Sequence, residues 1–193
     1  KEMLNREQEN TVIALCQAMI RQQSYSGHED GTAHVLAEHM RTMGFDSVET
    51  DRYGNLIGCI RGSRPGKKLL FDGHIDTVPV SDPAEWPYPP FAAEIHDGRI
   101  YGRGTSDMKG AVAAMTCAAA NFAQETKRDF AGEIYVAGVV HEECFEGVAA
   151  REISKAVKPD YVVIGEASQL NLKIGQRGRA EIVIETFGKP CHS

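Results

Sequence analysis

A histidine and an aspartate follow an apolar run near the middle of the chain, at a spacing that suits a metal ligand and its orienting acid. The run from Leu69 to Phe71 leads into His74 and Asp76. Residues two apart in an extended segment face the same side, so the carboxylate of Asp76 can reach the ring of His74. A metal-bound histidine commonly donates its other ring N–H to such a carboxylate, which fixes its tautomer. Because an ordinary surface loop can also contain a lone His-x-Asp, the pair gains weight only from its neighbours.

Four more acidic residues occupy comparable positions. Glu142 and Glu143 follow one apolar run, Glu166 follows another, and Asp107 lies in a glycine-rich turn before an alanine-rich segment. Each has an ordinary interpretation: Asp107 as a helix N-cap, the glutamate pair as a solvated helix start, and Glu166 as an acid after a strand. Adjacent carboxylates repel each other unless a cation compensates them. Imidazole together with carboxylates suits Zn²⁺, Mn²⁺ or Co²⁺.

This residue set could activate water. Two metal ions a few ångströms apart would lower the pKa of a bridging water to ~7 and polarise a carbonyl. Adjacent residues point different ways, so one of Glu142 and Glu143 could bind metal while the other takes the proton from the water and hands it to a leaving amine. A nucleotide site is disfavoured, because Gly102, Gly104 and Gly110 do not meet the G-x-G-x-x-G spacing and the sequence has no P-loop.

The composition is that of an ordinary soluble globular protein. Of 193 residues, 42% are hydrophobic and 25% are charged, and the formal net charge is −6. Without a basic patch, nucleic acid and anionic membranes are not expected partners. No apolar run reaches the ~20 residues of a transmembrane helix, and no signal-peptide pattern opens the chain. The five cysteines are scattered without C-x-x-C spacing, which fits a reducing cytoplasm better than a disulfide framework.

Helical and extended patterns alternate along the chain. Helices are predicted near 12–20, 33–43 and 108–122, and strands near 46–51, 55–62, 67–74, 133–140 and 161–166. A hairpin is predicted to turn at Asp97-Gly98, after a proline-rich loop over 79–90. The alternation predicts an α/β fold, with a mostly parallel twisted sheet covered by helices on both faces. Ligands of such sheets bind beyond the carboxyl ends of the strands, where His74 and the acids are placed.

The pattern changes after Leu170. Residues 180–188 alternate between apolar and polar side chains, as in a half-exposed antiparallel strand. We therefore predict one α/β domain over 1–176 and the first strand of a second domain, cut off at Ser193, over 177–193.

Five segments, in order, resemble one family of enzymes: FDGHIDTVPV, YGRGTSDMKGAVAAM, GVVHEECFEGVA, VIGEAS and GQRGRAEIVIETFGKPCHS. The family is that of the zinc metallopeptidases that include acetylornithine deacetylase, succinyl-diaminopimelate desuccinylase, aminoacylase and carboxypeptidase G. The resemblance implies a zinc-exopeptidase-like catalytic domain, represented by 1–176, and an α+β lid or dimerisation domain that begins at 177. It also implies hydrolysis of an amide bond in a small peptide or an N-acyl amino acid. A carbamoyl-amino-acid hydrolase and a non-catalytic family member are the alternatives.

The resemblance assigns the metal ligands by position. His74 and Glu166 would bind one of two divalent ions, Glu143 would bind the other, and Asp107 would bridge both. The peptide bond after Asp107 is typically cis in this family. Zinc is the metal implied, with cobalt or manganese as options.

The other site residues would act on the water, the ligands and the substrate. Glu142 would be the general base, Asp76 would orient His74, and His192 would steady the substrate carbonyl oxygen from the lid, often across the interface of a homodimer. A further metal-binding histidine normally lies far downstream of the position of Ser193. We therefore expect the 193-residue chain to lack one ligand of the second metal and to have little or no activity by itself.

Overall fold

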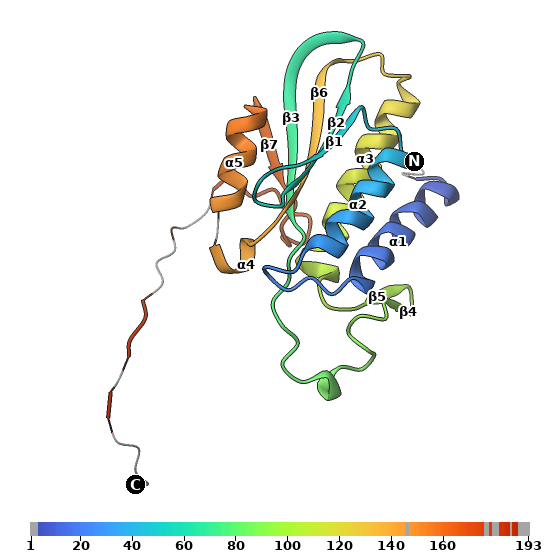
Figure 1. The fold of residues 1–193 in the computed structure, drawn as a ribbon. Coiled ribbons are helices and arrows are strands. Elements are labelled where there is room, and N and C mark those ends of the chain that lie inside the picture. The colour runs from blue at the N-terminus through green and yellow to red at the C-terminus, as the bar shows by residue number, and fades with distance from the viewer. Residues whose placement is uncertain (1–3, 146, 176–177, 179–181, 186, 189–193) are drawn as a thin grey trace.

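The computed structural model describes residues 4–145, 147–175, 178, 182–185 and 187–188 (Figure 1). The helices are α1 (Arg6–Arg21), α2 (Asp30–Thr42), α3 (Gly110–Glu125), α4 (Glu142–Phe145) and α5 (Val148–Val157), with short helical turns η1 (Pro83–Glu85) and η2 (Thr105–Lys109). The strands are β1 (Ser47–Thr50), β2 (Leu56–Arg61), β3 (Arg64–His74), β4 (Glu94–His96), β5 (Arg99–Tyr101), β6 (Ala131–Val139) and β7 (Tyr161–Ile164). Each predicted helix and strand of the α/β domain is present within a few residues of its expected position.

The main sheet has the strand order β1-β2-β6-β3-β7. β3 pairs in parallel with β6 and β7, whereas β1–β2 and β2–β6 are antiparallel. The α/β class is confirmed, but the sheet is mixed. Only a short turn joins β1 to β2, and a parallel connection needs a dozen or more residues. Asp51 builds that turn, because its carboxylate accepts the backbone N–H groups of Tyr53 and Asn55.

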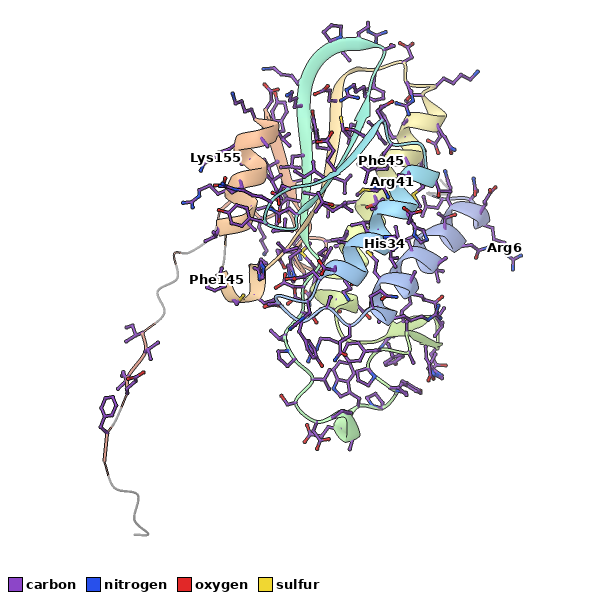
Figure 2. The ribbon with its side chains drawn as sticks, in the orientation of Figure 1. Arg6, His34, Arg41, Phe45, Phe145 and Lys155 are labelled. Carbon is purple, nitrogen blue, oxygen red and sulfur yellow. The ribbon has the colours of Figure 1, made fainter. Side chains whose placement is uncertain are left out.

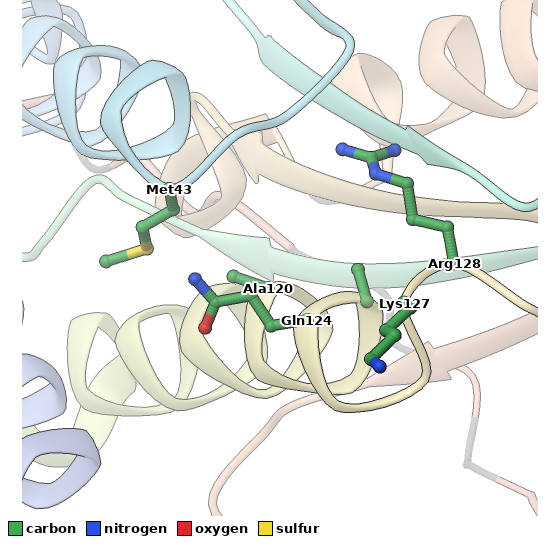
Figure 3. Close-up of a pocket in the computed structure, with 6 residues that line it drawn as sticks. Met43, Ala120, Gln124, Lys127 and Arg128 are labelled. Atoms are coloured by element: carbon green, nitrogen blue, oxygen red, sulfur yellow. The ribbon is translucent and has the colours of Figure 1, made fainter.

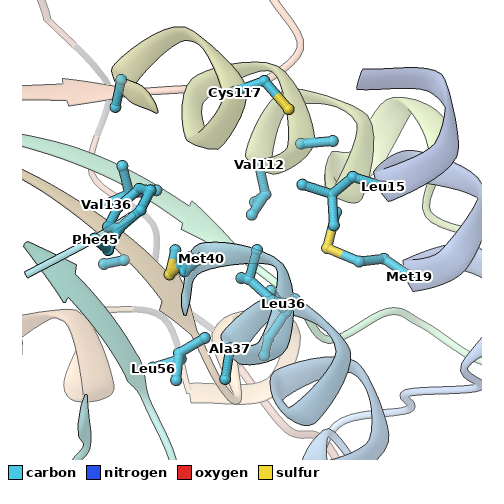
Figure 4. Close-up of a cluster of buried hydrophobic side chains, with 14 of the residues drawn as sticks. Leu15, Met19, Leu36, Ala37, Met40, Phe45, Leu56, Val112, Cys117 and Val136 are labelled. Atoms are coloured by element: carbon cyan, nitrogen blue, oxygen red, sulfur yellow. The ribbon is translucent and has the colours of Figure 1, made fainter. Parts of the chain in front are cut away.

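Helices cover both faces of this sheet, as predicted. Figure 1 shows α1, α2 and α3 on one side and α5 on the other. The larger core lies on the side of the first three helices, and Figure 4 shows part of it. Its fully buried side chains include Leu15, Met19, Leu36, Met40, Val112 and Val136. Charged residues such as Arg6 on α1 and Lys155 on α5 point outward on opposite sides of the molecule (Figure 2).

Helix α3 packs closely on the sheet because its buried residues are small. The buried set is Val112, Ala113, Thr116, Cys117, Ala119, Ala120 and Ala123. The helix predicted near 108–122 begins slightly later than expected, since Met108 precedes α3, and Phe122 on this helix is 44% exposed. The backbone leaves helical geometry at Asp107 and Met108, and this break makes the helix begin at Gly110.

The segment between β3 and α3 is mostly loop. The predicted hairpin is confirmed: β4 and β5 pair antiparallel around Asp97-Gly98. The ring of Tyr88 stacks on His96 with ring centroids 3.7 Å apart, which ties the proline-rich loop to this hairpin. Within the described part of the chain, no helix is long and apolar enough to cross a membrane.

Strand β7 lies at the edge of the sheet, and its side chains are 46–61% exposed. Beyond Leu170, the large apolar side chains of the described residues are also exposed. The predicted domain division at 176–177 and the strand over 177–193 fall largely outside the described residues and stay predictions.

Candidate metal centre

The predicted site residues come together at one edge of the sheet. β6, β3 and β7 run parallel, so their carboxyl ends meet at this edge. His74 is the last residue of β3, Glu142 and Glu143 begin α4 just after β6, and Glu166 follows β7. Asp107 comes from η2, which precedes α3.

The imidazole of His74, which is 2% exposed, lies at the centre of this group. On one side, its Nδ1 is 3.0 Å from the backbone oxygen of Asp76 and 3.5 Å from Asp76 Oδ1. On the other side, Nε2 is 2.9 Å from Asp107 Oδ1, 3.7 Å from Glu166 Oε1 and 3.9 Å from Glu142 Oε2. A backbone oxygen can only accept, so Nδ1–H donates to Asp76 and Nε2 faces the acids.

Two overlapping sets of side chains could hold a cation here. One is His74, Asp107 and Glu166, and the other is His74, Glu142 and Glu143, with the ligand atoms of each set within 4.8 Å of one another. Among the described residues, none of these carboxylates pairs with a lysine or arginine. An imidazole with uncompensated carboxylates fits Zn²⁺ or a similar divalent ion.

The pKa values show the same excess of negative charge. Burial raises the pKa of Glu142, and the nearby Glu166 and Glu143 raise it further. Burial also raises the pKa of Glu143, with Asp107 the next cause. Burial by itself lowers the pKa of His74, but its contacts with Asp76 and Asp107 outweigh burial and raise that pKa to about 10. A divalent cation would relieve this repulsion and favour the charged carboxylates.

Asp76 contacts both the ring of His74 and the backbone of α4. Its side chain is 0% exposed and accepts from Ser26 Oγ at 2.6 Å. Its two oxygens also accept the backbone N–H groups of Glu142 and Glu143, each at 3.1 Å. Burial opposes the ionised form, but the hydrogen bonds with His74 and Ser26 outweigh it and lower the pKa of Asp76.

The comparison with protein families agrees with this geometry. Residues 70–191 match peptidase family M20/M25/M40. The chain belongs to this family. Succinyl-diaminopimelate desuccinylase 2 from Ruegeria sp. (strain TM1040) is 33% identical over 193 residues, which cover 94% of this chain and 48% of that protein. The uncharacterized protein YgeY from Escherichia coli (strain K12) is 35% identical over 180 residues, which cover 90% of this chain and 43% of that protein.

The fold also matches solved structures of peptidases. The di-peptidase Dug1p from Saccharomyces cerevisiae superposes with a TM-score of 0.68 at 18% identity, over 82% of this chain and 38% of that chain. At that identity the likeness shows the fold alone. The M20-family chain described here spans a little less than half the length of the curated relatives named above.

One further expectation from the resemblance is confirmed, and another lies outside the described residues. The peptide bond between Asp107 and Met108 is cis. His192 falls on residues that the structure does not describe. The structure thus brings together His74, Asp76, Asp107 and the three glutamates, while their individual roles stay predictions.

Sequence reasoning missed several polar residues that support this M20 site. Lys109 is fully buried, and its Nζ donates to the backbone oxygens of Met19 and Gln22 at 3.0 and 2.8 Å. It thereby ties η2 to the end of α1. A lysine in the apolar surroundings of Met108 and α3 was the available signal. Ser26 had no such signal, because its partner Asp76 is 50 residues away.

A hollow in the described structure lies away from this centre. It has a volume of about 280 Å³ and is lined by Met43, Ala120, Ala123, Gln124, Lys127 and Arg128 (Figure 3). These residues lie toward the C-terminal end of α3, whereas the metal-binding candidates lie beyond its N-terminal end. None of the predicted site residues lines this hollow.

Proposed function

We propose that this chain is part of a metal-dependent hydrolase that cleaves an amide bond in a small peptide or an N-acyl amino acid. The observation that carries the proposal is the convergence of four carboxylates from η2, α4 and the end of β7 on one buried imidazole, with no lysine or arginine of the described residues to neutralise them. Membership of a peptidase family supports this chemistry.

His74, Asp107 and Glu166 would hold one divalent ion, and Glu143 would hold a second ion that Asp107 bridges to the first. Zinc is the metal proposed, with cobalt or manganese as alternatives. When bound, such ions supply a Lewis acid for the carbonyl and make water a stronger nucleophile. Asp76 would keep His74 in the tautomer that presents Nε2 to the metal.

Glu142 would be the general base. It would take a proton from the attacking water and return it to the leaving nitrogen of the amide. A base works best when its pKa is close to the working pH, and burial together with neighbouring acids raises the pKa of Glu142 in that direction. His192 would steady the carbonyl oxygen of the substrate. The whole protein would be a homodimer and would act in the cytoplasm.

The names of the relatives suggest the substrate class. One relative is named a desuccinylase, and the yeast structural neighbour is described as a di-peptidase. Both names denote cleavage of an amide beside an acyl or amino-acid group. Hydrolysis of an N-carbamoyl amino acid is an alternative with the same chemistry, and a non-catalytic binding role is the alternative outside catalysis.

The proposal is tested on the full-length protein, by metal analysis and by assays of the wild type and Glu142→Gln on a panel of dipeptides, N-acyl and N-carbamoyl amino acids. The variant should retain its metal and lose ~100-fold or more of kcat, as expected when a general base is removed. Glu38→Gln is the control, because Glu38 is exposed on α2 and its carboxylate pairs with Arg41 alone among the residues that the structure describes. If Glu142→Gln kept both metal and activity, Glu142 would not be the base. Activity that survives complete metal removal would refute a metal-dependent hydrolase.

A further inference from the structure

The loop between α1 and α2 is joined to the segment that follows His74. Ser24 Oγ donates to the backbone oxygen of Ile75 at 2.6 Å, and the backbone N–H of Thr77 donates to Ser24 O at 2.8 Å. One residue further along the loop, Tyr25 forms a parallel bridge with Thr77. Ser26 then binds the Asp76 carboxylate. This loop therefore runs beside the candidate metal centre.

Glu29 ends this loop, and its side chain turns toward α4. It is 5% exposed, and its Oε1 accepts the backbone N–H groups of Gly27 at 3.0 Å and His141 at 3.1 Å. Although Glu29 occupies the N-cap position of α2, its side chain makes no hydrogen bond to the first turn of that helix. Acidic residues at this position usually cap their own helix, but such capping does not account for the buried position of the Glu29 side chain.

His141 lies in the short connection between β6 and the two glutamates of the centre. Its φ of 58° lies in the left-handed region, which a residue other than glycine adopts only when its surroundings hold it there. With the contacts of Asp76, the backbone N–H groups of His141, Glu142 and Glu143 all donate to two buried carboxylates. Such N–H groups at the start of a helix have no partner within the helix itself.

We infer that Glu29 is a positioning residue for the metal centre. By binding the N–H of His141, it fixes the turn that directs Glu142 and Glu143 toward His74. The inference rests on the proposed metal centre. Glu29 contacts neither glutamate side chain and acts through the backbone of His141, whereas Asp107 and Glu166 reach the centre from segments that Glu29 does not hold.

Because Glu29 holds only the segment that carries Glu143, its removal should affect the binding affinities of the two ions differently. Zinc is titrated into the metal-free, full-length protein in competition with a chelator, for the wild type, Glu29→Ala, Glu29→Gln and the control Glu38→Ala. Glu29→Ala should weaken the binding of the ion held through Glu143 by ~10-fold or more, the usual effect of losing a residue that supports a ligand. The ion held by His74, Asp107 and Glu166 should bind nearly as before. Glu29→Gln keeps an oxygen that can accept from His141, so it should restore the wild-type affinity.

Thermal unfolding of the same metal-free proteins separates positioning from general stability. If Glu29→Ala lowered the unfolding temperature but left both zinc affinities unchanged, Glu29 would be structural only and the inference would be overturned. Should Glu29→Ala not fold, Glu29→Asp serves instead, because it keeps the charge but is one methylene too short to reach His141, and unchanged zinc affinities would overturn the inference equally. A wild type that takes up no zinc, cobalt or manganese would overturn the proposed function, and this inference with it.

Discussion

The buried Lys109 gives the most direct quantitative test of the structure. Burial lowers its pKa from 10.5 to about 8, even though its ammonium group binds two backbone oxygens at the end of α1. Between these pH values the unfolded chain binds a proton that the folded protein does not, so stability rises with pH over that interval. A difference of about 2.5 pKa units corresponds to about 3 kcal/mol in total. Replacement with methionine removes this dependence and keeps the apolar stem.

The expected result is therefore a pH-dependent difference between wild type and Lys109→Met. From pH 7 to pH 10, the free energy of unfolding of the wild type should rise by about 2 to 3 kcal/mol relative to the variant. Urea unfolding of the metal-free proteins at four pH values measures this, with Lys155→Met, an exposed lysine on α5, as the control. The thiol of Cys16, whose pKa burial raises to about 11, titrates in both proteins and largely cancels in the difference. Parallel stability curves for wild type and Lys109→Met would falsify the reasoning.

Two further substitutions test the polar contacts around the centre. Asp76→Ala should reduce the free energy of unfolding at pH 7 by about 3–5 kcal/mol, because buried donors including His74 lose a charged acceptor. The same variant should bind zinc ~10–100-fold more weakly. A variant with wild-type stability and normal zinc affinity would contradict this prediction. Asn55→Ala should cost about 2–3 kcal/mol, since the fully buried Asn55 donates to Asp51 and accepts from the backbone N–H of Val140, at 2.7 and 3.0 Å. Urea unfolding measures the second effect against the exposed control Asn10→Ala, and equal stability of the two variants would refute it.

The sequence predicted the elements of the fold well because their signals are local. The alternation of apolar strands with helices sufficed for the class, and Asp97-Gly98 was enough for the hairpin. The direction of β1 and β2 was harder, because an apolar strand has the same appearance in either direction. The start of α3 was predicted slightly too early, since the irregular backbone at Asp107 and Met108 moves the start of the helix to Gly110. No periodicity in the sequence reveals such a break.

In the candidate site, too, some residues have a local sequence signal and others do not. His74, Asp107 and Glu166 could be proposed from the sequence because each lies at or just after the end of a strand or in a glycine-rich turn, and the structure brings these positions together at one edge of the sheet. The contacts of Glu29 with His141 and of Asn55 with Val140 could not be found in this way, because these partners lie 112 and 85 residues away and are backbone groups without a side-chain signature. A contact with a backbone N–H can be made with any residue type, so only the folded structure reveals it.

The acids of this centre fall into two kinds, which differ in the groups that face their oxygens. Asp76 and Glu29 are buried and face backbone N–H groups, so their charges are compensated by the fold itself. Asp107, Glu142 and Glu166 face Nε2 of His74 instead. In the metal-free protein, Asp76 and Asp107 outweigh burial and raise the pKa of His74 to about 10. A proton on the imidazole therefore contributes stability that is complete below pH 6.5 and is lost as the pH rises through about 10. A metal ion must displace this proton to reach Nε2. At neutral pH, a proton and a divalent cation therefore compete for one prearranged position.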